Sequence, residues 1–366
     1  MTAPASPLPA HLTPRLLGWF DKCARDLPWR KAGGGKKGGR RDPYRVWLAE
    51  IMLQQTTVGA VIPYFHDFLE RWPTVGDLAA AERDEVLRAW AGLGYYARGR
   101  NLHRCARTLV DEMAGRFPET CDELQALPGV GPYTAGAIAA LAFAEPVVAV
   151  DGNVIRVLAR LMALPDPMPQ AKAEVAAIAE ALLPRDHPGA FAEALMDLGA
   201  TVCRPRNPDC KACPWVADCR AHREGAPTDY PRRAPRKEKP TRRGIAFWVV
   251  RDDGAILLRR RAEKGLLGGM MEVPSTDWGP EFPPSRALTH AAPVPARWQA
   301  LPGTIRHTFT HFHLELKVVA GRVGPDAPTN GVWCPPARLD DHALPSVMKK
   351  VIRHALDGGP GGEIPL

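Results

Sequence analysis

The chain has 366 residues and a hydrophobic content of 45%, which is enough for two or three folded domains with real cores. Its formal net charge of +8 favours a polyanionic partner. No apolar run is long enough to span a membrane, and the first residues lack the pattern of a secretory signal, so we expect a soluble intracellular protein.

The N-terminal region is predicted to be helical with one charged insertion. Residues 1–12 are rich in Pro and Ala and are expected to be loose, whereas residues 12–23 have the pattern of a short amphipathic helix. Residues 31–41 combine Gly with Lys and Arg and contain nothing to bury, which indicates a flexible loop. Contact with phosphates and simple solvation are both compatible with this composition.

One carboxylate stands inside an apolar helix. A helix is predicted over residues 44–61, and in it Glu50 shares a face with Trp47 and Leu53 at helical spacing. Burial raises the pKa of a carboxyl group, which suits a general acid near neutral pH. The alternative is a buried Glu that is paired with an Arg.

Polar and aromatic side chains stand near the ends of the predicted helices. Gln54 and Gln55 offer donors and acceptors to a base edge, or are ordinary exposed residues. A Gly-rich bend over residues 92–96 carries Tyr95 and a second tyrosine, which either stack on bases or pack in a core. This bend separates helices predicted over residues 75–91 and 98–114.

A tight turn is predicted at residues 127–131. Pro128 restricts one φ, while Gly129 and Gly131 permit positive φ. The small apolar residues 135–143 that follow predict a buried helix. Unpaired amides at the start of such a helix can hold a phosphate, although a helix–turn–helix joint without a ligand has the same pattern.

A second carboxylate follows a short apolar run. Asp151 comes directly after residues 147–150 and is followed by Gly152 and Asn153. An acid at the end of an apolar segment, beside a possible anion site, is a candidate catalytic residue.

Four of the eight cysteines lie close together in the sequence. Cys203, Cys210, Cys213 and Cys219 place four thiolates in one loop, the ligand set of a [4Fe-4S] cluster or a structural zinc ion. Only one CxxC pair occurs, whereas zinc sites usually combine two. The remaining cysteines are interpreted as ordinary thiols: Cys23, Cys105, Cys121 and Cys334.

The pattern changes to strands after a basic, proline-containing linker at residues 226–243. Residues 245–250 and 255–258, with an Asp-Gly turn between them, predict a hairpin. Residues 308–316 alternate with period two and predict a strand, and residues 346–352 predict a helix.

Four segments resemble one family in the same order. WLAEIMLQQT (47–56), GLGYYARGRNL (92–102), ALPGVGPYTAGAI (126–138) and VDGNVIRVLAR (150–160) are similar to the adenine DNA glycosylases of the MutY type, which are helix–hairpin–helix DNA glycosylases. The cysteine spacing is similar to their iron–sulfur loop. The C-terminal part resembles the MutY domain that is related in fold to Nudix hydrolases, without the acidic magnesium-binding box.

This resemblance implies a multidomain protein. We expect a mostly α-helical glycosylase domain over residues 12–225 with a [4Fe-4S] loop at 203–219, the linker at 226–243, and an α+β Nudix-like domain at 244–356. The expected partner is double-stranded DNA with an adenine:8-oxoguanine mispair, bound by a monomer in the cytoplasm at the nucleoid.

The resemblance also implies roles for individual residues. In this family the adenine is flipped out of the duplex and hydrolysed from its sugar. Glu50 would protonate the adenine and later activate water, and Asp151 would stabilise the oxocarbenium-like sugar, with Tyr133 and Asn153 orienting them. The adenine pocket would contain Arg25, Trp29, Arg30 and Glu193, and the contacts to DNA and lesion would come from Gln54, Gln55, Tyr95, Leu127, Gly129, Gly131, Phe309, Thr310 and His311.

Two positions decide between subclasses. Tyr133 stands where glycosylase/lyases such as endonuclease III carry a Schiff-base Lys, so little strand-cleaving lyase activity is expected. Thr310 stands where the family has Ser in a Phe-Ser-His motif; it keeps the hydroxyl and adds a methyl group, which bears on lesion discrimination.

Three other functions share parts of this sequence pattern. An endonuclease III-like enzyme for oxidised pyrimidines predicts Lys at position 133 and no C-terminal domain. A non-catalytic iron–sulfur DNA-binding module gives no reason for Glu50 inside an apolar helix. A nucleotide-pyrophosphate hydrolase needs the missing acidic box.

Overall fold

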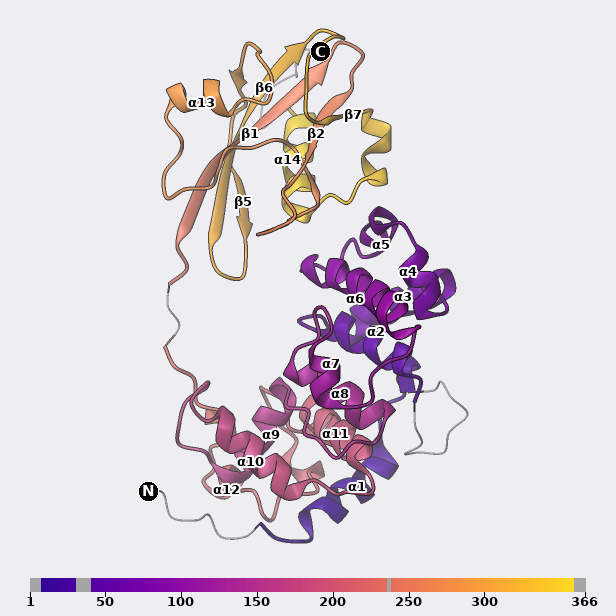
Figure 1. Cartoon of the computed structure of the whole chain (residues 1–366). Coiled ribbons are helices and arrows are strands. Elements are labelled where there is room, and N and C mark those ends of the chain that lie inside the picture. Colours follow the sequence, from indigo (N-terminus) through magenta and orange to yellow (C-terminus); the bar gives the residue numbers. More distant parts are fainter. Residues whose placement is uncertain (1–7, 31–40, 236–237, 359–366) are drawn as a thin grey trace. The chain divides into compact units, whose positions relative to one another are not determined.

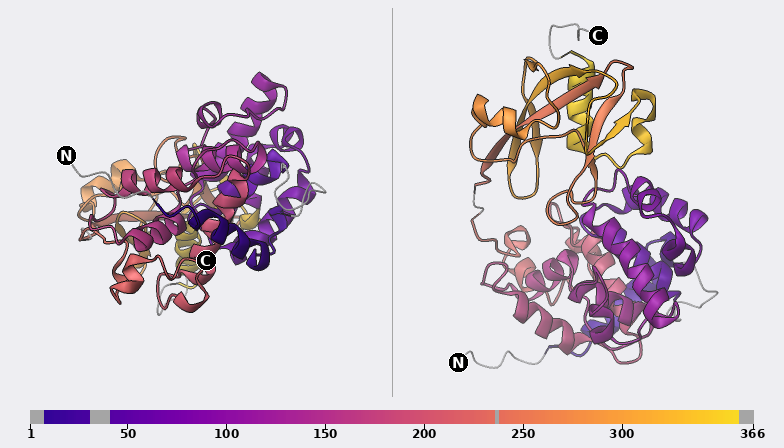
Figure 2. Two further views of the ribbon diagram at one scale, coloured as in Figure 1. Left: turned by 90° about the horizontal axis from the view of Figure 1, so that it is seen from below. Right: turned by 45° about the horizontal axis from the view of Figure 1, so that its top comes forward.

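The computed structural model describes residues 8–30, 41–235 and 238–358 (Figures 1 and 2). The expected loose start at 1–7 and the glycine-rich loop at 31–40 lie outside the described residues. The chain divides into two compact units, the first with residues up to 80 and 101–235, the second with residues 81–100 and 236 onward. None of the described helices combines the length and the apolar character that crossing a bilayer requires.

The first unit is helical and is built around α8, Pro132–Ala142, which is buried from Thr134 onward as predicted. α8 packs against α2, α7 and α11. Its small residues allow this close packing, because a Cβ on Gly136 would lie 3.0 Å from the carbonyl oxygen of Val148. The α-helices outside the sheet domain are α1 Leu12–Cys23, α2 Pro43–Leu53, α3 Val58–Arg71, α4 Val75–Ala80, α5 Arg83–Ala89, α6 Ala97–Met113, α7 Cys121–Gln125, α8, α9 Gly152–Met162, α10 Lys172–Leu182, α11 Pro188–Asp197 and α12 Arg220–Arg223.

Two predicted helices are each divided in the structure. The helix expected over 44–61 ends at Leu53, because Gln54 has ψ 114° and Gln55 has a left-handed φ of 59°. The helix expected over 75–91 is α4 and α5, since Glu82 is extended and starts a new helix. Periodicity continued across both breaks and did not reveal them.

The turn between α7 and α8 is the predicted hairpin. Gly129 has φ +79°, whereas Gly131 is extended at φ −93° and ψ 175° and is the N-cap of α8. Of the two glycines expected to permit positive φ, only Gly129 uses it. Leu127 is buried beneath the turn.

The second unit contains a seven-stranded mixed sheet with the order β3-β2-β1-β6-β4, in which β5 pairs with β6 and β7 with β2. The two long strands β1 and β6 run parallel, from Thr241 beside His313 to Arg251 beside Val323. Helix α14 packs on one face of the sheet (Figure 1). The elements are β1 Thr241–Arg251, β2 Ile256–Arg260, β3 Met271–Glu272, α13 Ser285–Ala291, β4 Gln299–Ala300, β5 Ile305–Thr308, β6 His313–Val323, β7 Val332–Cys334 and α14 Ser346–Leu356.

The sheet confirms the predicted hairpin and corrects one strand. β1 and β2 pair antiparallel, but β1 begins at Thr241, inside the expected linker. The strand expected over 308–316 is a β5–β6 hairpin whose turn holds residues 309–312. Phe309 and Phe312 both pack against the core with ring centroids 4.9 Å apart, and a continuous strand would have placed them on opposite faces.

We expect Gly129→Ala to lower the melting temperature of the helical unit and Gly131→Ala to change it little. At Gly129 a Cβ would be in the left-handed region and 2.6 Å from the Cβ of Asn101, at a cost of about 1–3 kcal/mol. At Gly131 nothing lies within 4 Å of the new Cβ, which leaves an N-cap loss below about 1 kcal/mol. Thermal unfolding followed by far-ultraviolet circular dichroism measures both variants, and equal melting temperatures would contradict this assignment.

Candidate active site

A cavity of about 790 Å³ opens in the helical unit where α2 ends and α8, α9 and α11 meet. It brings together residues far apart in the sequence, including every predicted catalytic and adenine-pocket residue. Its lining includes Glu50, Tyr133, Asp151, Asn153, Arg25, Trp29, Arg30, Glu193, Gln54 and Gln55.

Glu50 is buried on α2 and is hydrogen-bonded to a neutral group. The hydroxyl of Tyr133 donates to Glu50 Oε2 at 2.9 Å. Burial raises the pKa of Glu50 to about 7, and the charges of Asp151 and Glu193 add to this, while the hydrogen bond from Tyr133 opposes it. Among the described residues no ion pair joins Glu50 to an arginine, because Arg30 and Arg41 pair with Glu193 and Asp197, so the alternative of a Glu–Arg pair is not observed there. Glu50 can therefore hold or release a proton near neutral pH.

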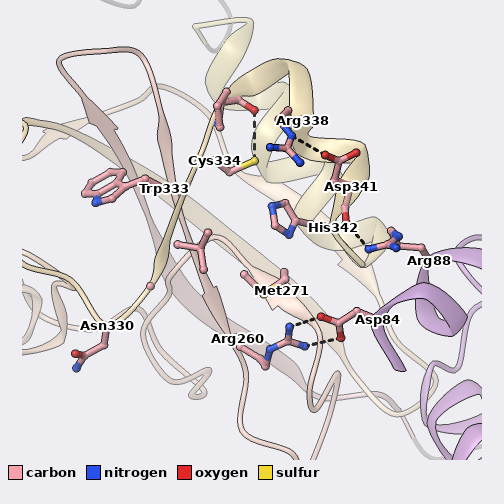
Figure 3. A pocket seen from close by; sticks show the side chains of 13 residues that line it. Asp84, Arg88, Arg260, Met271, Asn330, Trp333, Cys334, Arg338, Asp341 and His342 are labelled. Carbon is pink, nitrogen blue, oxygen red and sulfur yellow. Dashed lines mark hydrogen bonds and ion pairs between the residues drawn. The ribbon is translucent and has the colours of Figure 1, made fainter. Parts of the chain in front are cut away.

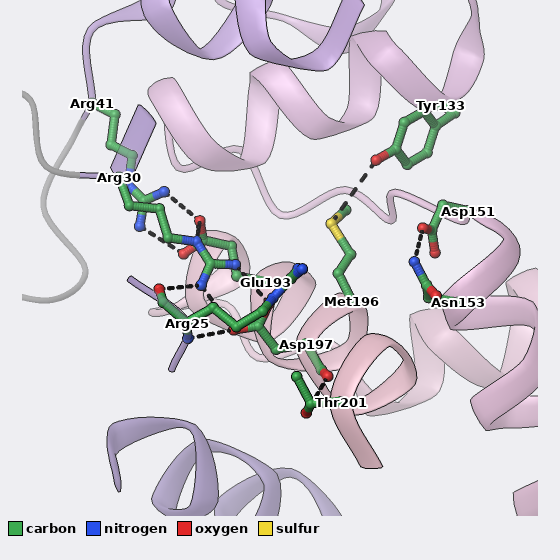
Figure 4. A network of polar contacts seen from close by, with 10 residues as sticks. All are labelled: Arg25, Arg30, Arg41, Tyr133, Asp151, Asn153, Glu193, Met196, Asp197 and Thr201. Carbon is green, nitrogen blue, oxygen red and sulfur yellow. Dashed lines mark hydrogen bonds and ion pairs between the residues drawn. The ribbon is translucent and has the colours of Figure 1, made fainter. Parts of the chain in front are cut away.

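Tyr133 lies in the first turn of α8 and remains a phenol. Burial, followed by the nearby charge of Glu50, raises its pKa well above the ordinary value. Its hydroxyl also lies 3.9 Å from Sδ of Met196 (Figure 4). The group in the Lys position of glycosylase/lyases is thus a neutral hydrogen-bond donor.

Asp151 is the N-cap of α9, which explains why an acid stands directly before this helix. Its Oδ1 accepts from the backbone N–H of Val154 at 2.7 Å, and its Oδ2 accepts from the amide of Asn153 at 2.7 Å. Asn153 is fixed in turn by Arg156, whose Nη2 donates to its Oδ1 at 2.8 Å. The carboxylate of Asp151 is therefore oriented by two neutral donors, of which Figure 4 shows the amide of Asn153.

A network of arginines and acids forms another wall of the cavity. Arg30 Nε lies 2.8 Å from Glu193 Oε1, and Arg41 Nη2 donates to Glu193 Oε2 at 2.6 Å. Arg30 also donates to both oxygens of Asp197, at 2.8 and 2.9 Å, and Arg25 Nε donates to Asp197 at 2.6 Å (Figure 4).

Asp197 and Arg41 were missed by sequence reasoning. Asp197 is fully buried on α11; burial works against its charge, but the hydrogen bonds and charge of Arg30, with Arg25, hold its pKa below the ordinary value. The sequence pattern that could have identified Asp197 is an acid inside an apolar helix, four residues after Glu193. An acid inside an apolar helix is also the pattern that identified Glu50. Arg41 gave no such signal, because it ends the charged insertion.

The other predicted residues near the cavity have local structural partners. Gln54 donates to the hydroxyl of Thr134 at 3.0 Å. Trp29 is buried with its ring edge-on to Phe65, at a centroid distance of 5.4 Å. Gln55 has the left-handed backbone that ends α2.

The four clustered cysteines line one small cavity with Arg160. Arg160 is a buried cation whose Nη1 lies 3.3 Å from Cys203 Sγ and which also donates to backbone carbonyls of the same loop. Among the described residues, no three side chains of the metal-binding types lie close enough together to hold one ion.

The predicted lesion-binding residues of the second unit lie on the β5–β6 turn. Thr310 and His311 are exposed, whereas Phe309 is partly buried against Trp278. Tyr95 is 49% exposed, has a φ of +45°, and its hydroxyl lies 3.0 Å from Oγ1 of Thr310. The structure thus brings together two residues that are 215 positions apart.

Comparisons with known proteins agree with both units. Residues 48–185 match the HhH-GPD superfamily of base excision DNA repair proteins, and residues 245–354 match the NUDIX domain. The adenine DNA glycosylase of Homo sapiens is 37% identical over 405 residues, covering 94% of this chain and 74% of the relative. That of Mycolicibacterium smegmatis is 39% identical over 251 residues, covering 68% of this chain and 83% of the relative.

A solved structure supports the fold of the helical unit. The structure of a thermostable thymine-DNA glycosylase superposes with a TM-score of 0.52 and 28% identity, covering 58% of this chain and 95% of the other. Together with the cavity and its two carboxylates, the relatives show that the chain belongs to the adenine DNA glycosylase family of the MutY type.

Proposed function

We propose that this protein is a monofunctional base-excision-repair DNA glycosylase that hydrolyses adenine from a mispair with 8-oxoguanine. The observation that carries the proposal is a buried carboxyl group, Glu50, with a pKa of about 7, in one cavity with Asp151. Family membership supports adenine as the base that is removed.

The two carboxyl groups divide the chemistry as in glycoside hydrolysis. Protonated Glu50 gives its proton to N7 of the flipped adenine, and the N-glycosidic bond breaks with its electron pair moving to the base. The sugar becomes oxocarbenium-like, and the carboxylate of Asp151 stabilises it. Water then attacks C1′ and gives a proton to Glu50, which leaves free adenine and an abasic site.

Two neighbours position these groups. The hydroxyl of Tyr133 holds Glu50 Oε2, and the amide of Asn153 holds Asp151 Oδ2. A phenol cannot form an imine with the abasic sugar, so the strand remains intact after base release.

The adenine pocket and the opposite base are assigned to separate parts of the chain. The pairs of Arg30 and Arg41 with Glu193 support an adenine pocket with a fixed polar wall. The exposed Thr310 and His311 on the β5–β6 turn support contact with 8-oxoguanine. The hairpin with Gly129 and the N-terminus of α8 supply backbone amides for a DNA phosphate.

We also propose a [4Fe-4S] cluster bound by the thiolates of Cys203, Cys210, Cys213 and Cys219. Thiolates are the ligands of such clusters, and buried Arg160 supplies positive charge beside them. The cluster would act structurally, by holding the loop at 203–219 together.

We expect Glu50→Gln to abolish adenine release, a loss of roughly 100-fold or more. The wild-type single-turnover rate should fall about tenfold per pH unit above about pH 7, because Glu50 then loses its proton. The assay uses a duplex with adenine opposite 8-oxoguanine and compares strand cleavage with and without alkali. Exposed Glu180 on α10 offers the control Glu180→Gln, which should keep the wild-type rate.

Three results would contradict that assignment: a flat pH profile, strand cleavage without alkali, or cleavage at oxidised pyrimidines in place of adenine release. The last of these would favour the endonuclease III-like alternative.

Thr310→Ala should reduce the preference for 8-oxoguanine over guanine about fivefold, the worth of one hydrogen bond of about 1 kcal/mol. Thr310→Ser keeps the hydroxyl and should keep the preference. The ratio of adenine release rates opposite the two bases measures it. A ratio that is the same in all three proteins would remove Thr310 from recognition.

Protein purified without added metal should contain about four irons and four inorganic sulfides per chain. Cys213→Ser should lower both, because each thiolate holds one corner of the cluster, whereas Cys105→Ser, at a buried thiol outside the loop, should not. Elemental analysis that finds zinc in place of iron would refute the cluster.

A further inference from the structure

A second cavity of about 490 Å³ lies in the sheet domain and is lined by four arginines. It lies outside the cavity assigned to adenine. The arginines are Arg242, Arg259, Arg260 and Arg261, and the other lining residues that matter are Glu272, Asp277 and Trp278.

Two of these arginines share one carboxylate. Glu272 is buried on β3, and its Oε1 lies 2.7 Å from Nη2 of Arg259 while its Oε2 is held by Arg261. Two guanidinium groups against one carboxylate leave one positive charge without a counter-charge. The ion pairs with Glu272 also hold the side chains of Arg259 and Arg261 in place before any ligand binds, which lowers the entropy cost of binding.

The other two arginines differ in their partners. Arg260 is neutralised by Asp84 of the same compact unit, with Nη2 2.6 Å from Oδ2 (Figure 3). Arg242 is exposed, and the ion pairs found among the described residues include none for it. Its guanidinium lies 4.5 Å from the ring centroid of Phe312. Asp277, which is exposed at the rim, is the remaining acid.

Two lining residues of the cavity, Trp278 and Arg242, contact aromatic rings of the turn assigned to lesion recognition. The Arg261 guanidinium lies 5.2 Å from the ring centroid of Trp278, and Trp278 stacks on Phe309 at 5.9 Å and an interplanar angle of 29°. Arg242 reaches the same turn through Phe312. An anion held here would therefore lie beside the nucleotide that Thr310 and His311 contact.

We propose that this arginine cavity binds a nucleotide phosphate, and specifically a backbone phosphate of the DNA strand that the β5–β6 turn contacts. Guanidinium groups bind phosphate oxygens through two parallel N–H donors, and the excess positive charge favours an anion. The proposal rests on the proposed function, because it takes DNA as the ligand of this turn.

The test compares Arg242→Ala with Arg322→Ala in the full chain. Arg322 is an exposed arginine of the same sheet domain, near the far end of β6 from His313, and does not line the cavity. Affinity is measured over a range of salt for a duplex with 8-oxoguanine opposite a 2′-fluorinated, uncleavable adenosine, and for the undamaged duplex. Thermal unfolding shows that each variant is folded.

We expect Arg242→Ala to weaken binding to both duplexes about three- to tenfold and to reduce the slope of log Kd against log salt by about one. Arg242→Lys should keep the slope, and Arg322→Ala should change neither quantity. If Arg242→Ala and Arg322→Ala weakened DNA binding equally, the proposal would be overturned, because loss of any exposed arginine of the sheet domain would then have the same effect on affinity.

Free nucleotide is the other source of the same phosphate. Calorimetric titration with deoxyguanosine mono- and triphosphate should give no binding in the micromolar range. Tight nucleotide binding that Arg242→Ala removes, with an unchanged salt dependence for DNA, would overturn DNA as the ligand. Failure of the proposed function would appear separately, as wild-type protein that releases no adenine.

Discussion

The helical unit depends on burying one carboxyl group, that of Glu50, which forms no ion pair with any residue that the structure describes. Its pKa of about 7 in the folded protein lies above the ordinary value of 4.5, so the folded state binds this proton more tightly than the unfolded chain. Stability therefore falls as pH rises from about 4.5 to about 7, and above that range the buried charge costs about 3 kcal/mol at about 1.4 kcal/mol per pKa unit. The same burial makes the group a proton donor at neutral pH.

The acids around the cavity have two different kinds of partner. Glu193 and Asp197 are paired with arginines, which satisfies their charges and joins α11 to the N-terminal segment. Glu50 and Asp151 are held by a phenol, an amide and a backbone N–H, all of them neutral. Arginines thus form one wall of the cavity, while the two groups proposed for the chemistry are hydrogen-bonded to neutral donors.

In the sheet domain, aromatic rings connect the β5–β6 turn to the arginine-lined cavity. Phe309 and Phe312 pack against the core at both ends of the β5–β6 turn, and the two residues between them, Thr310 and His311, are exposed. Trp278 and Arg242 rest on these same rings. A turn fixed in this way can present a hydroxyl and an imidazole without losing much side-chain freedom on binding.

Local chemistry in the sequence was sufficient to predict the buried helix α8, the tight turn at residues 127–131 and the β1–β2 hairpin, and to mark Glu50 and Asp151 as candidate catalytic residues. Each of these depends on a residue's own backbone preference or on the apolar character of its immediate neighbours. Tertiary structure decided which group would meet which: Tyr133 with Glu50, the arginines with Glu193 and Asp197, and Phe309 with Phe312. It also decided the break at Gln55 and the turn at 309–312, where periodicity ran on unchanged. Such choices follow from contacts between distant segments, whose energies outweigh local preference and leave no mark on spacing along the chain.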